Sequence, residues 1–286
     1  MHTTIAILGG DQRQIVAKEH LETLGLRVRC WGLGGADTHA DWREAVEGAH
    51  CILLPLPASE DGVRIRCPLH TGNGIRFSAL MEALPAEALL FGGKIPPRWM
   101  ESGEASGISM WDYNVSEVFQ LRNAGPTAEG AILLAVQETG ETVNGMETAV
   151  LGYGRIASLL AEKLILLGAH VTVYARRDRD LAHAALRGLH TVRLNEADGY
   201  ASLLDLRARM VFNTVPQQIV TEEHLLRWSR SCVLMELASA PGGFDSLAAE
   251  RLGFKRIHAS ALPGRLFPST AGKLLAQTVY ERLTEQ

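Results

Sequence analysis

The feature that most constrains the fold of this 286-residue chain is a glycine turn near its middle, in residues 148–157. An apolar run leads into the turn and leucines at three- and four-residue spacing follow it, which predicts a buried strand, a tight turn and a helix. Gly152 is expected to make the turn, and Gly154, which lacks a Cβ, lets a pyrophosphate approach the backbone at the helix N-terminus. The residues predicted to form this phosphate site are Gly152, Tyr153, Gly154, Arg155 and Ile156.

The strand predicted after this helix ends on two arginines, where an acid is usual. Arg176 follows Gly152 by 24 residues, near the spacing of about 20 at which a dinucleotide-binding unit carries an Asp or Glu for the ribose hydroxyl. The guanidiniums of Arg176 and Arg177 suit a 2′-phosphate instead. We therefore predict NADP(H) as the cofactor, with NAD(H) as the alternative. The competing interpretation is a structural βαβ unit with two solvated arginines.

Composition favours two globular domains and disfavours nucleic-acid and membrane roles. Domains commonly run about 100–200 residues, so 286 residues suit two. A net charge of −4 offers no basic surface for nucleic acid. No apolar run reaches the roughly 18 residues of a membrane span, and the N-terminus lacks signal-peptide character, so a cytoplasmic protein is expected. The four cysteines lack metal-binding spacing, and no metal site is expected.

Strand-like and helix-like patterns alternate on both sides of a central helical segment. This alternation predicts an α/β fold with two Rossmann-like parallel-sheet domains joined by hinge helices. The predicted N-terminal substrate domain covers residues 1–123 and is completed by a C-terminal helix in 268–286. A helix in 124–144, starting at Pro126 or Thr127, is expected to cross between the domains. Residues 145–267 are the predicted dinucleotide-binding domain.

Polar residues at predicted strand ends and helix starts are candidate substrate ligands. Open α/β sheets bind ligands at the carboxyl ends of their strands. Asp11 and Arg13 follow the first strand, and Lys94 follows another after two glycines. Thr127 and Thr270 begin the two hinge helices, where anions bind well. The alternatives are a helix N-cap for Asp11, a surface charge for Lys94 and simple capping for the two threonines.

Two strand ends of the second domain also carry polar groups. The run Asn213-Thr214-Val215-Pro216 is expected to meet the far ribose and the nicotinamide. Glu236 ends the next strand, either as a carboxylate at the edge of the core or as an acceptor for the cofactor amide. Long loops are often functional, and residues 57–76 of the first domain are predicted to form one.

Several runs, in order along nearly the whole chain, resemble the family of dipicolinate synthase A subunits. The Pro126-to-Gly130 and Ala261-to-Gly264 runs are more specific than the glycine turn. Two departures concern Ala157, where the family usually has glycine, and residues 266–269, which are bulkier and less basic than expected. The matching runs are Gly9-Gly10-Asp11 with Arg13-Gln14, Asn123-Ala-Gly-Pro-Thr-Ala-Glu-Gly130, Leu151-Gly-Tyr-Gly-Arg155, Phe212-Asn-Thr-Val-Pro216, Glu236-Leu-Ala-Ser239 with Pro241-Gly-Gly243, and Ala261-Leu-Pro-Gly264 with Thr270-Ala-Gly272.

The resemblance implies an NADP-linked dehydrogenation of a cyclic dihydropyridine dicarboxylate from the lysine pathway, which yields dipicolinate for bacterial endospores. It also implies a partner, a separately encoded and flavoprotein-like B subunit, with the pair located in the mother-cell cytoplasm of a sporulating bacterium. In that setting Arg13, Lys94, Thr127 and Thr270 are expected to hold the carboxylates of the substrate. Thr127 and Glu129 are the candidate catalytic residues, with Glu129 accepting or relaying a proton.

Two other functions are compatible with the same patterns. Dehydrogenases of the 2-hydroxyacid, alanine dehydrogenase or S-adenosylhomocysteine hydrolase type share the two-domain plan, so fold-level likeness does not exclude them. They generally rely on a histidine or lysine near the nicotinamide, and only His258 lies near a final strand end. A non-catalytic NADP-binding protein that regulates a partner is the other alternative. Self-association into a homo-oligomer is left open by the sequence.

Overall fold

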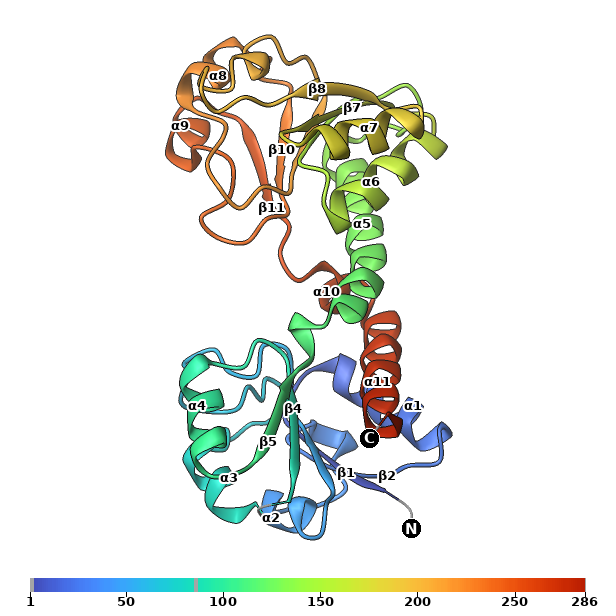
Figure 1. Ribbon diagram of the computed structural model, residues 1–286, viewed down its shortest axis with the longest axis vertical. Helices are drawn as coiled ribbons and strands as arrows, with labels where there is room; N and C mark the ends of the chain where they lie inside the picture. Colours follow the sequence, from blue (N-terminus) through green and yellow to red (C-terminus); the bar gives the residue numbers. More distant parts are fainter. Residues whose placement is uncertain (1–2, 85–86, 286) are drawn as a thin grey trace. The chain divides into compact units, whose positions relative to one another are not determined.

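The computed structural model describes residues 3–84 and 87–285, which divide into two compact units. The first unit contains the described residues up to Asn123 together with those from Phe267 onward, and the second runs from Ala124 to Leu266. Each unit holds one parallel sheet (Figure 1). The predicted fold class of two Rossmann-like parallel sheets is therefore confirmed. None of the described helices is both long and apolar enough to cross a membrane.

The first sheet has five parallel strands in the order β2-β1-β3-β4-β5. Its order reverses at β1, whose Ile7 is paired with Cys30 of β2 on one side and Leu53 of β3 on the other. This reversal makes the carboxyl ends of β1 and β3 the topological switch point, where open α/β sheets bind ligands. The strands are β1 (Thr4–Leu8), β2 (Arg27–Trp31), β3 (Cys51–Leu53), β4 (Leu89–Gly92) and β5 (Ser109–Asp112).

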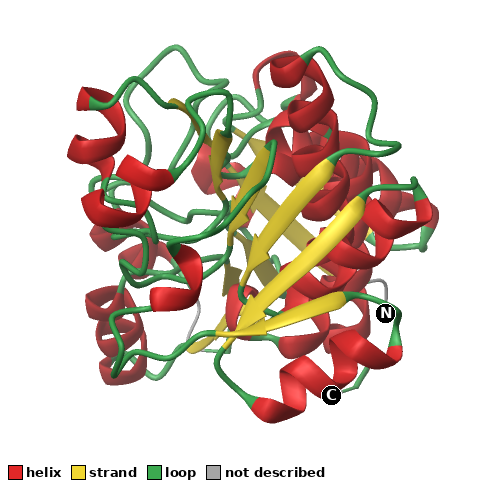
Figure 2. Cartoon of the chain, turned by 90° about the horizontal axis from the view of Figure 1, so that it is seen from above, coloured by secondary structure: helices red, strands yellow, loops and turns green. Residues whose placement is uncertain are grey.

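Helices cover both faces of the first sheet, because side chains that alternate along each strand point to opposite faces. Ala6 and Leu8 of β1 pack with one set of helices, and Ile5 and Ile7 pack with the other. Figure 2 shows strands lying between helices. The first set is α2 (Trp42–Val46), α3 (Phe77–Ala83) and α4 (Pro97–Ala105); the second is α1 (Gln12–Thr23), the first part of α5 (Glu117–Thr139) and α11 (Pro268–Thr284).

The C-terminal helix α11 is packed closely on α1 within the first unit (Figure 1). Gly272 makes this approach possible, because a Cβ on it would lie 2.5 Å from the carbonyl oxygen of Arg13 and 2.6 Å from Cβ of Val16. At the other end, Arg122 of α5 makes a two-bond ion pair with Glu281, at 2.7 and 3.0 Å. The helix begins at Pro268 as predicted.

The second sheet has six parallel strands in the order β11-β10-β9-β6-β7-β8. Its order reverses at β6, whose Leu151 pairs with Tyr174 of β7 and with Asn213 of β9. The switch point of this sheet therefore lies at the carboxyl ends of β6 and β9. The strands are β6 (Glu147–Leu151), β7 (His170–Ala175), β8 (His190–Arg193), β9 (Met210–Asn213), β10 (Val233–Glu236) and β11 (Lys255–His258).

Each face of the second sheet is likewise covered by its own set of helices. Val150 lies in a core with alanines of α5 and leucines of the next helix, and Leu151 lies in the core of the opposite face. The first face carries the second part of α5, α6 (Arg155–Leu166), α7 (Asp178–Leu186) and α10 (Leu262–Leu266). The opposite face carries α8 (Glu222–Arg227) and α9 (Ser246–Arg251).

The crossing helix begins earlier than predicted. We expected its start at Pro126 or Thr127, but α5 begins at Glu117 and contains Pro126 in its interior. A proline inside a helix removes one hydrogen bond and costs about 3 kcal/mol. The helix continues because both parts have buried partners: Phe119 lies in the core of the first unit, and Ala128 lies in the core of the second.

Candidate functional site

The glycine turn at the switch point of the second sheet has the predicted backbone. Gly152 has a φ of +96°, and a Cβ there would lie 2.4 Å from Oγ1 of Thr214. Only glycine fits these two conditions. Gly154 is the N-cap of α6, and within the described chain no side chain caps this N-terminus. A Cβ on Gly154 would meet no atom within 4 Å. The space beside Gly154, at the N-terminus of α6, can thus admit an anion.

Thr214 connects the two strands of this switch point. Its backbone N–H and its Oγ1 both donate to the carbonyl oxygen of Leu151, each at 2.9 Å. Thr214 therefore lies directly beside the glycine turn. Val215 is half-buried and Pro216 is exposed.

Asn213 and Glu236 form a buried polar pair at the ends of β9 and β10. Asn213 Nδ2 donates to Glu236 Oε1 at 2.6 Å and to the Val215 carbonyl oxygen at 2.9 Å. The carboxylate also accepts from the N–H groups of Ala238, at 3.0 Å, and Gly243, at 2.8 Å. These contacts favour the first of the two interpretations of Glu236, a carboxylate at the edge of the core. Both side chains hold the loops that follow the strands.

The two arginines after β7 are exposed and precede α7, with Arg177 as its N-cap. Arg193, at the end of the neighbouring strand β8, donates to the carbonyl oxygen of Arg176 at 3.2 Å and forms an ion pair with Asp178. Arg193 was not predicted from the sequence. Its strand pairing with β7 brings it here, across 17 residues of chain.

The other residues of the predicted phosphate site lie on α6 or just before it. Arg155 is exposed at the first position of the helix, and Ile156 is half-buried. Tyr153 packs against the core, and its hydroxyl is buried without a hydrogen-bond partner in the described structure. Burial raises the pKa of Tyr153 above its ordinary value.

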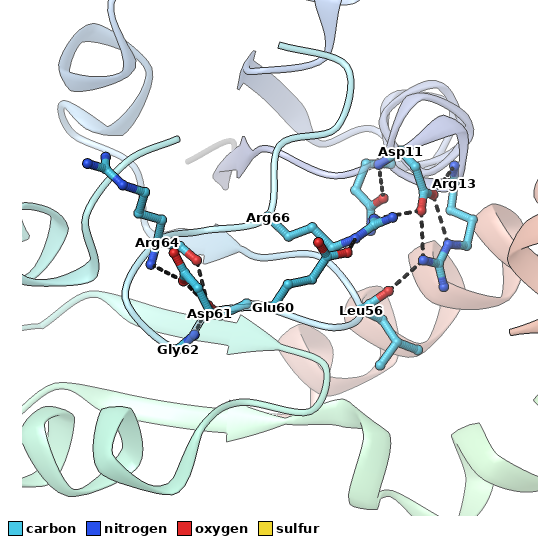
Figure 3. A network of polar contacts seen from close by, with 10 residues as sticks. Asp11, Arg13, Leu56, Glu60, Asp61, Gly62, Arg64 and Arg66 are labelled. Carbon is cyan, nitrogen blue, oxygen red and sulfur yellow. Dashed lines mark hydrogen bonds and ion pairs between the residues drawn. The ribbon is translucent and has the colours of Figure 1, made fainter. Parts of the chain in front are cut away.

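In the first unit, Asp11 and Arg13 are brought together at the switch point between β1 and β3. Arg13 donates to the Asp11 carboxylate through Nε and Nη2, at 2.9 and 2.8 Å, and to the Leu56 carbonyl oxygen at 2.5 Å (Figure 3). Asp11 also accepts from the N–H of Arg13 and is the N-cap of α1. The N-cap interpretation of Asp11 is thus confirmed, and the same carboxylate orients Arg13.

The loop after β3 adds two residues that the sequence did not single out. Arg66 Nη1 binds Asp11 Oδ2 at 2.9 Å, and Arg66 Nε binds Glu60 Oε1 at 2.6 Å (Figure 3). The chain Glu60–Arg66–Asp11–Arg13 therefore carries two positive and two negative charges. The sequence did predict a long loop here, but the contact of Arg66 with Asp11 joins residues 55 positions apart.

The arginines control the ionisation of Asp11. Burial by itself raises the pKa of this carboxyl, but the hydrogen bonds and charge of Arg13 and the hydrogen bond of Arg66 outweigh burial and lower it to about 2. Burial by itself lowers the pKa of Arg13, and Asp11 raises it overall. The group is thus a fixed carboxylate among fixed guanidiniums at neutral pH.

The other predicted substrate residues of the first unit are separate from this network. Lys94 lies two residues after β4, is exposed and has a φ of +49°; its N–H donates to Asp112 Oδ1 at 3.0 Å. Thr270 lies in the first turn of α11 and is exposed. No hydrogen bond within the described ranges joins either side chain to Asp11 or Arg13.

Thr127 and Glu129 lie inside α5, so the helix-start environment expected for them is wrong. Thr127 is buried. The Glu129 side chain is 56% exposed and forms an ion pair with Lys163 of α6 at 3.0 Å. The early start of α5 removes the dipole argument for both residues, because that effect is confined to the first turn.

A hollow of about 570 Å³ lies in the second unit, but away from these residues. Its lining includes Glu147, Arg209 and Cys232, at or just before the first residues of β6, β9 and β10. Parallel strands place their two ends at opposite edges of a sheet, so this hollow is at the edge opposite the glycine turn. Among residues 3–84 and 87–285, no cluster of His, Cys, Asp or Glu could hold a metal ion.

Two solved structures share the fold at low identity. A transhydrogenase from Sinorhizobium meliloti is 13% identical, with a TM-score of 0.66, 98% of this chain covered and 92% of the other. An L-alanine dehydrogenase is 14% identical, with a TM-score of 0.62 and coverages of 97% and 88%. These likenesses establish the fold alone.

Closer relatives match nearly the whole length. The dipicolinate synthase A subunit of Bacillus subtilis (strain 168) is 28% identical, over 98% of this chain and 96% of its own. The crystal structure of the dipicolinate synthase A subunit from Bacillus halodurans is 27% identical, with a TM-score of 0.88, 99% of this chain covered and 98% of the other. Residues 4–114 match the family of N-terminal domains of the dipicolinate synthase A subunit. The chain is thus similar to the dipicolinate synthase A subunit over nearly its full length, and residues 4–114, which contain the first sheet, match the model of that N-terminal domain family.

Proposed function

We propose that this protein is the A subunit of a dipicolinate synthase. In this proposal it oxidises a cyclic dihydropyridine dicarboxylate with NADP and releases pyridine-2,6-dicarboxylate. The observation that carries the proposal is the open glycine turn at a sheet switch point, in a chain related along its length to the dipicolinate synthase A subunit.

The residues around the glycine turn fit a dinucleotide. Gly154 leaves room for the pyrophosphate, and the uncapped N-terminus of α6 offers it N–H donors. The exposed guanidiniums of Arg176 and Arg177 are suited to the 2′-phosphate of NADP. A nicotinamide cofactor is therefore the expected partner of the second unit, and NADP is favoured over NAD.

The first unit supplies a site for a carboxylate. Arg13 is held rigidly by Asp11 and by the Leu56 carbonyl oxygen, so it offers a donor whose orientation is already fixed. Lys94 and Thr270 are the further candidate ligands in this proposal. A ring that carries two carboxylates needs at least two such donors.

The reaction removes two hydrogens from the dihydropyridine ring, one as hydride and one as a proton. NADP, when bound, supplies the acceptor for the hydride. The chain has to position the ring and receive the proton, and aromatisation of the ring provides much of the driving force. In this proposal Glu129 receives or relays the proton, and Thr127 is the second candidate catalytic residue.

Glu129 can be tested separately from its ion pair. Glu129→Gln is expected to lower kcat while leaving cofactor affinity nearly unchanged. Lys163→Gln breaks the same ion pair but keeps the carboxylate, so it should retain kcat. Equal kcat values for Glu129→Gln and wild type would limit Glu129 to a structural role.

The resemblance also suggests partners and a setting. We propose that a flavoprotein-like B subunit works with this chain, and that the pair acts in the cytoplasm of a sporulating mother cell. Co-purification of the two tagged proteins at equal amounts would support the complex. Full activity of this chain by itself, unchanged when the B subunit is added, would argue against the need for a partner.

A second candidate function is an alanine dehydrogenase-like enzyme, favoured by the shared fold of an L-alanine dehydrogenase. The two candidates are distinguished by substrate. Purified protein with NADP or NAD would be given either a dihydrodipicolinate synthase reaction or L-alanine, with and without the B subunit. Ultraviolet absorbance of pyridine-2,6-dicarboxylate that depends on this chain supports the proposal. Turnover of alanine without that product supports the alternative, and cofactor binding with neither reaction supports a regulatory role.

A further inference from the structure

We infer that Arg66 is a carboxylate-binding residue at the switch point of the first sheet. In the absence of a ligand, Glu60 binds the guanidinium of Arg66, and a ligand carboxylate replaces Glu60 there. The inference deepens the proposed function, on which it rests for the identity of the ligand. It concerns the loop between β3 and α3, which no step of the proposed reaction uses.

The position of Arg66 is fixed at the place where this fold binds ligands. Its backbone N–H donates to the Ala58 carbonyl oxygen at 3.0 Å, and its own carbonyl oxygen accepts from the N–H of Gly10 at 2.8 Å. Gly10 belongs to the turn that follows β1. Arg66 is thus tied to the switch point by backbone as well as by its Nη1 contact with Asp11.

The guanidinium of Arg66 is only partly used. Its Nη1 binds Asp11 and its Nε binds Glu60, at 2.9 and 2.6 Å. Nε and Nη2 together form the side-on edge of a guanidinium, which can bind both oxygens of one carboxylate. Arg13 uses this two-bond geometry with Asp11. Glu60 contacts Arg66 through Nε alone, so a carboxylate that also reaches Nη2 makes one more charged hydrogen bond.

Glu60 is a weakly held occupant. Its side chain is 70% exposed, against 21% for Arg66. Exposed ion pairs contribute little to stability, because water screens the charges and two long side chains must be ordered. Arg66, by contrast, keeps its contact with Asp11 when Glu60 leaves. Exchange of Glu60 for a ligand carboxylate therefore leaves the rest of the network in place (Figure 3).

The test measures binding of pyridine-2,6-dicarboxylate to the full chain by isothermal titration in the presence of NADP. Arg66→Gln removes the fork and should weaken binding about tenfold or more. Arg66→Lys keeps the charge without the fork and should fall between wild type and Arg66→Gln. Glu60→Gln removes the competitor and should tighten binding by about two- to fivefold. Glu82→Gln, an exposed charge-matched change on α3, is the control and should leave the affinity unchanged.

The outcomes separate this inference from the proposed function. The inference is overturned if Arg66→Gln binds the dicarboxylate as tightly as the wild type does. It is also overturned if the wild type does not bind the dicarboxylate. If Glu60→Gln and Glu82→Gln bind the dicarboxylate with equal affinity, Glu60 does not compete with the ligand for Arg66. If the dicarboxylate binds through Arg66 but the protein forms none of it from the dihydropyridine, the site stands and the proposed reaction falls. Thermal unfolding of each variant checks that the chain is folded.

Discussion

Asn213 donates to Glu236 across the buried edge of the second sheet, with 2.6 Å between Nδ2 and Oε1. Through this bond the last residue of β9 is joined to the last residue of β10. The same carboxylate also holds the loops that start at Ala238 and reach Gly243. The two polar side chains expected to touch a cofactor thus shape the loops beside the glycine turn.

Glu236→Gln should destabilise the second unit. The amide that replaces one carboxylate oxygen brings N–H donors to a place where Asn213 and two backbone N–H groups already donate. A buried donor without an acceptor costs about 1–3 kcal/mol. The measurement is urea-induced unfolding, with Glu250→Gln on the exposed side of α9 as the matched control. Equal stabilities of the two variants would contradict the role assigned to Glu236.

Gly152→Ala should lower the stability of the fold, whereas Gly154→Ala should lower the affinity for the cofactor. At Gly152 the positive φ and the clash with Thr214 cost about 1–3 kcal/mol of stability. At Gly154 a methyl group meets only open space, so the fold should be retained while NADP(H) affinity falls about tenfold, or about 1.4 kcal/mol. Thermal unfolding and cofactor titration measure the two effects. Unchanged affinity in Gly154→Ala would contradict dinucleotide binding at this turn.

Arg176→Asp should weaken NADP(H) binding by about ten- to a hundredfold, because a charged hydrogen bond to phosphate contributes about 1.5–3 kcal/mol. NAD(H) lacks the 2′-phosphate and should lose much less. Arg227→Asp, the same charge change at an exposed position of α8, controls for net charge. Equal losses for both cofactors would rule out a 2′-phosphate contact at Arg176.

Asp11→Asn should destabilise the first unit in a pH-dependent way. The pKa of Asp11 is lowered from its ordinary value of 3.8 to about 2 in the folded chain, where Arg13 and Arg66 outweigh the effect of burial. Its contribution, about 2 kcal/mol, is therefore present above pH 3.8 and lost as the pH falls toward 2. The difference in unfolding free energy between wild type and Asp11→Asn should shrink over that interval. A constant difference would show that the ionised form is not what stabilises the fold.

Local patterns predicted the parts of the fold that depend on neighbouring residues. The turn at Gly152 and the helix after Gly154 need only short-range geometry, and both were expected within a few residues of their actual positions. The capping role of Asp11 is also local, since its partner is Arg13, two residues away.

Contacts distant in sequence could not be predicted in the same way. Arg66 reaches Asp11 only because strand order places the loop after β3 beside the turn after β1. Pro126 indicated a helix start from local propensity, but buried contacts on both sides of it keep α5 continuous. In each case tertiary packing decides, and a single sequence carries no direct record of it.

The most direct test of the central claim is the stoichiometry of the reaction. Purified chain, NADP and a dihydrodipicolinate synthase reaction would be combined without oxygen, and the reduced cofactor and pyridine-2,6-dicarboxylate would be quantified together. The proposed dehydrogenation predicts equal amounts of NADPH and product, both formed about tenfold more slowly by Gly154→Ala at low NADP. Product formed without reduced cofactor would contradict hydride transfer to NADP by this protein.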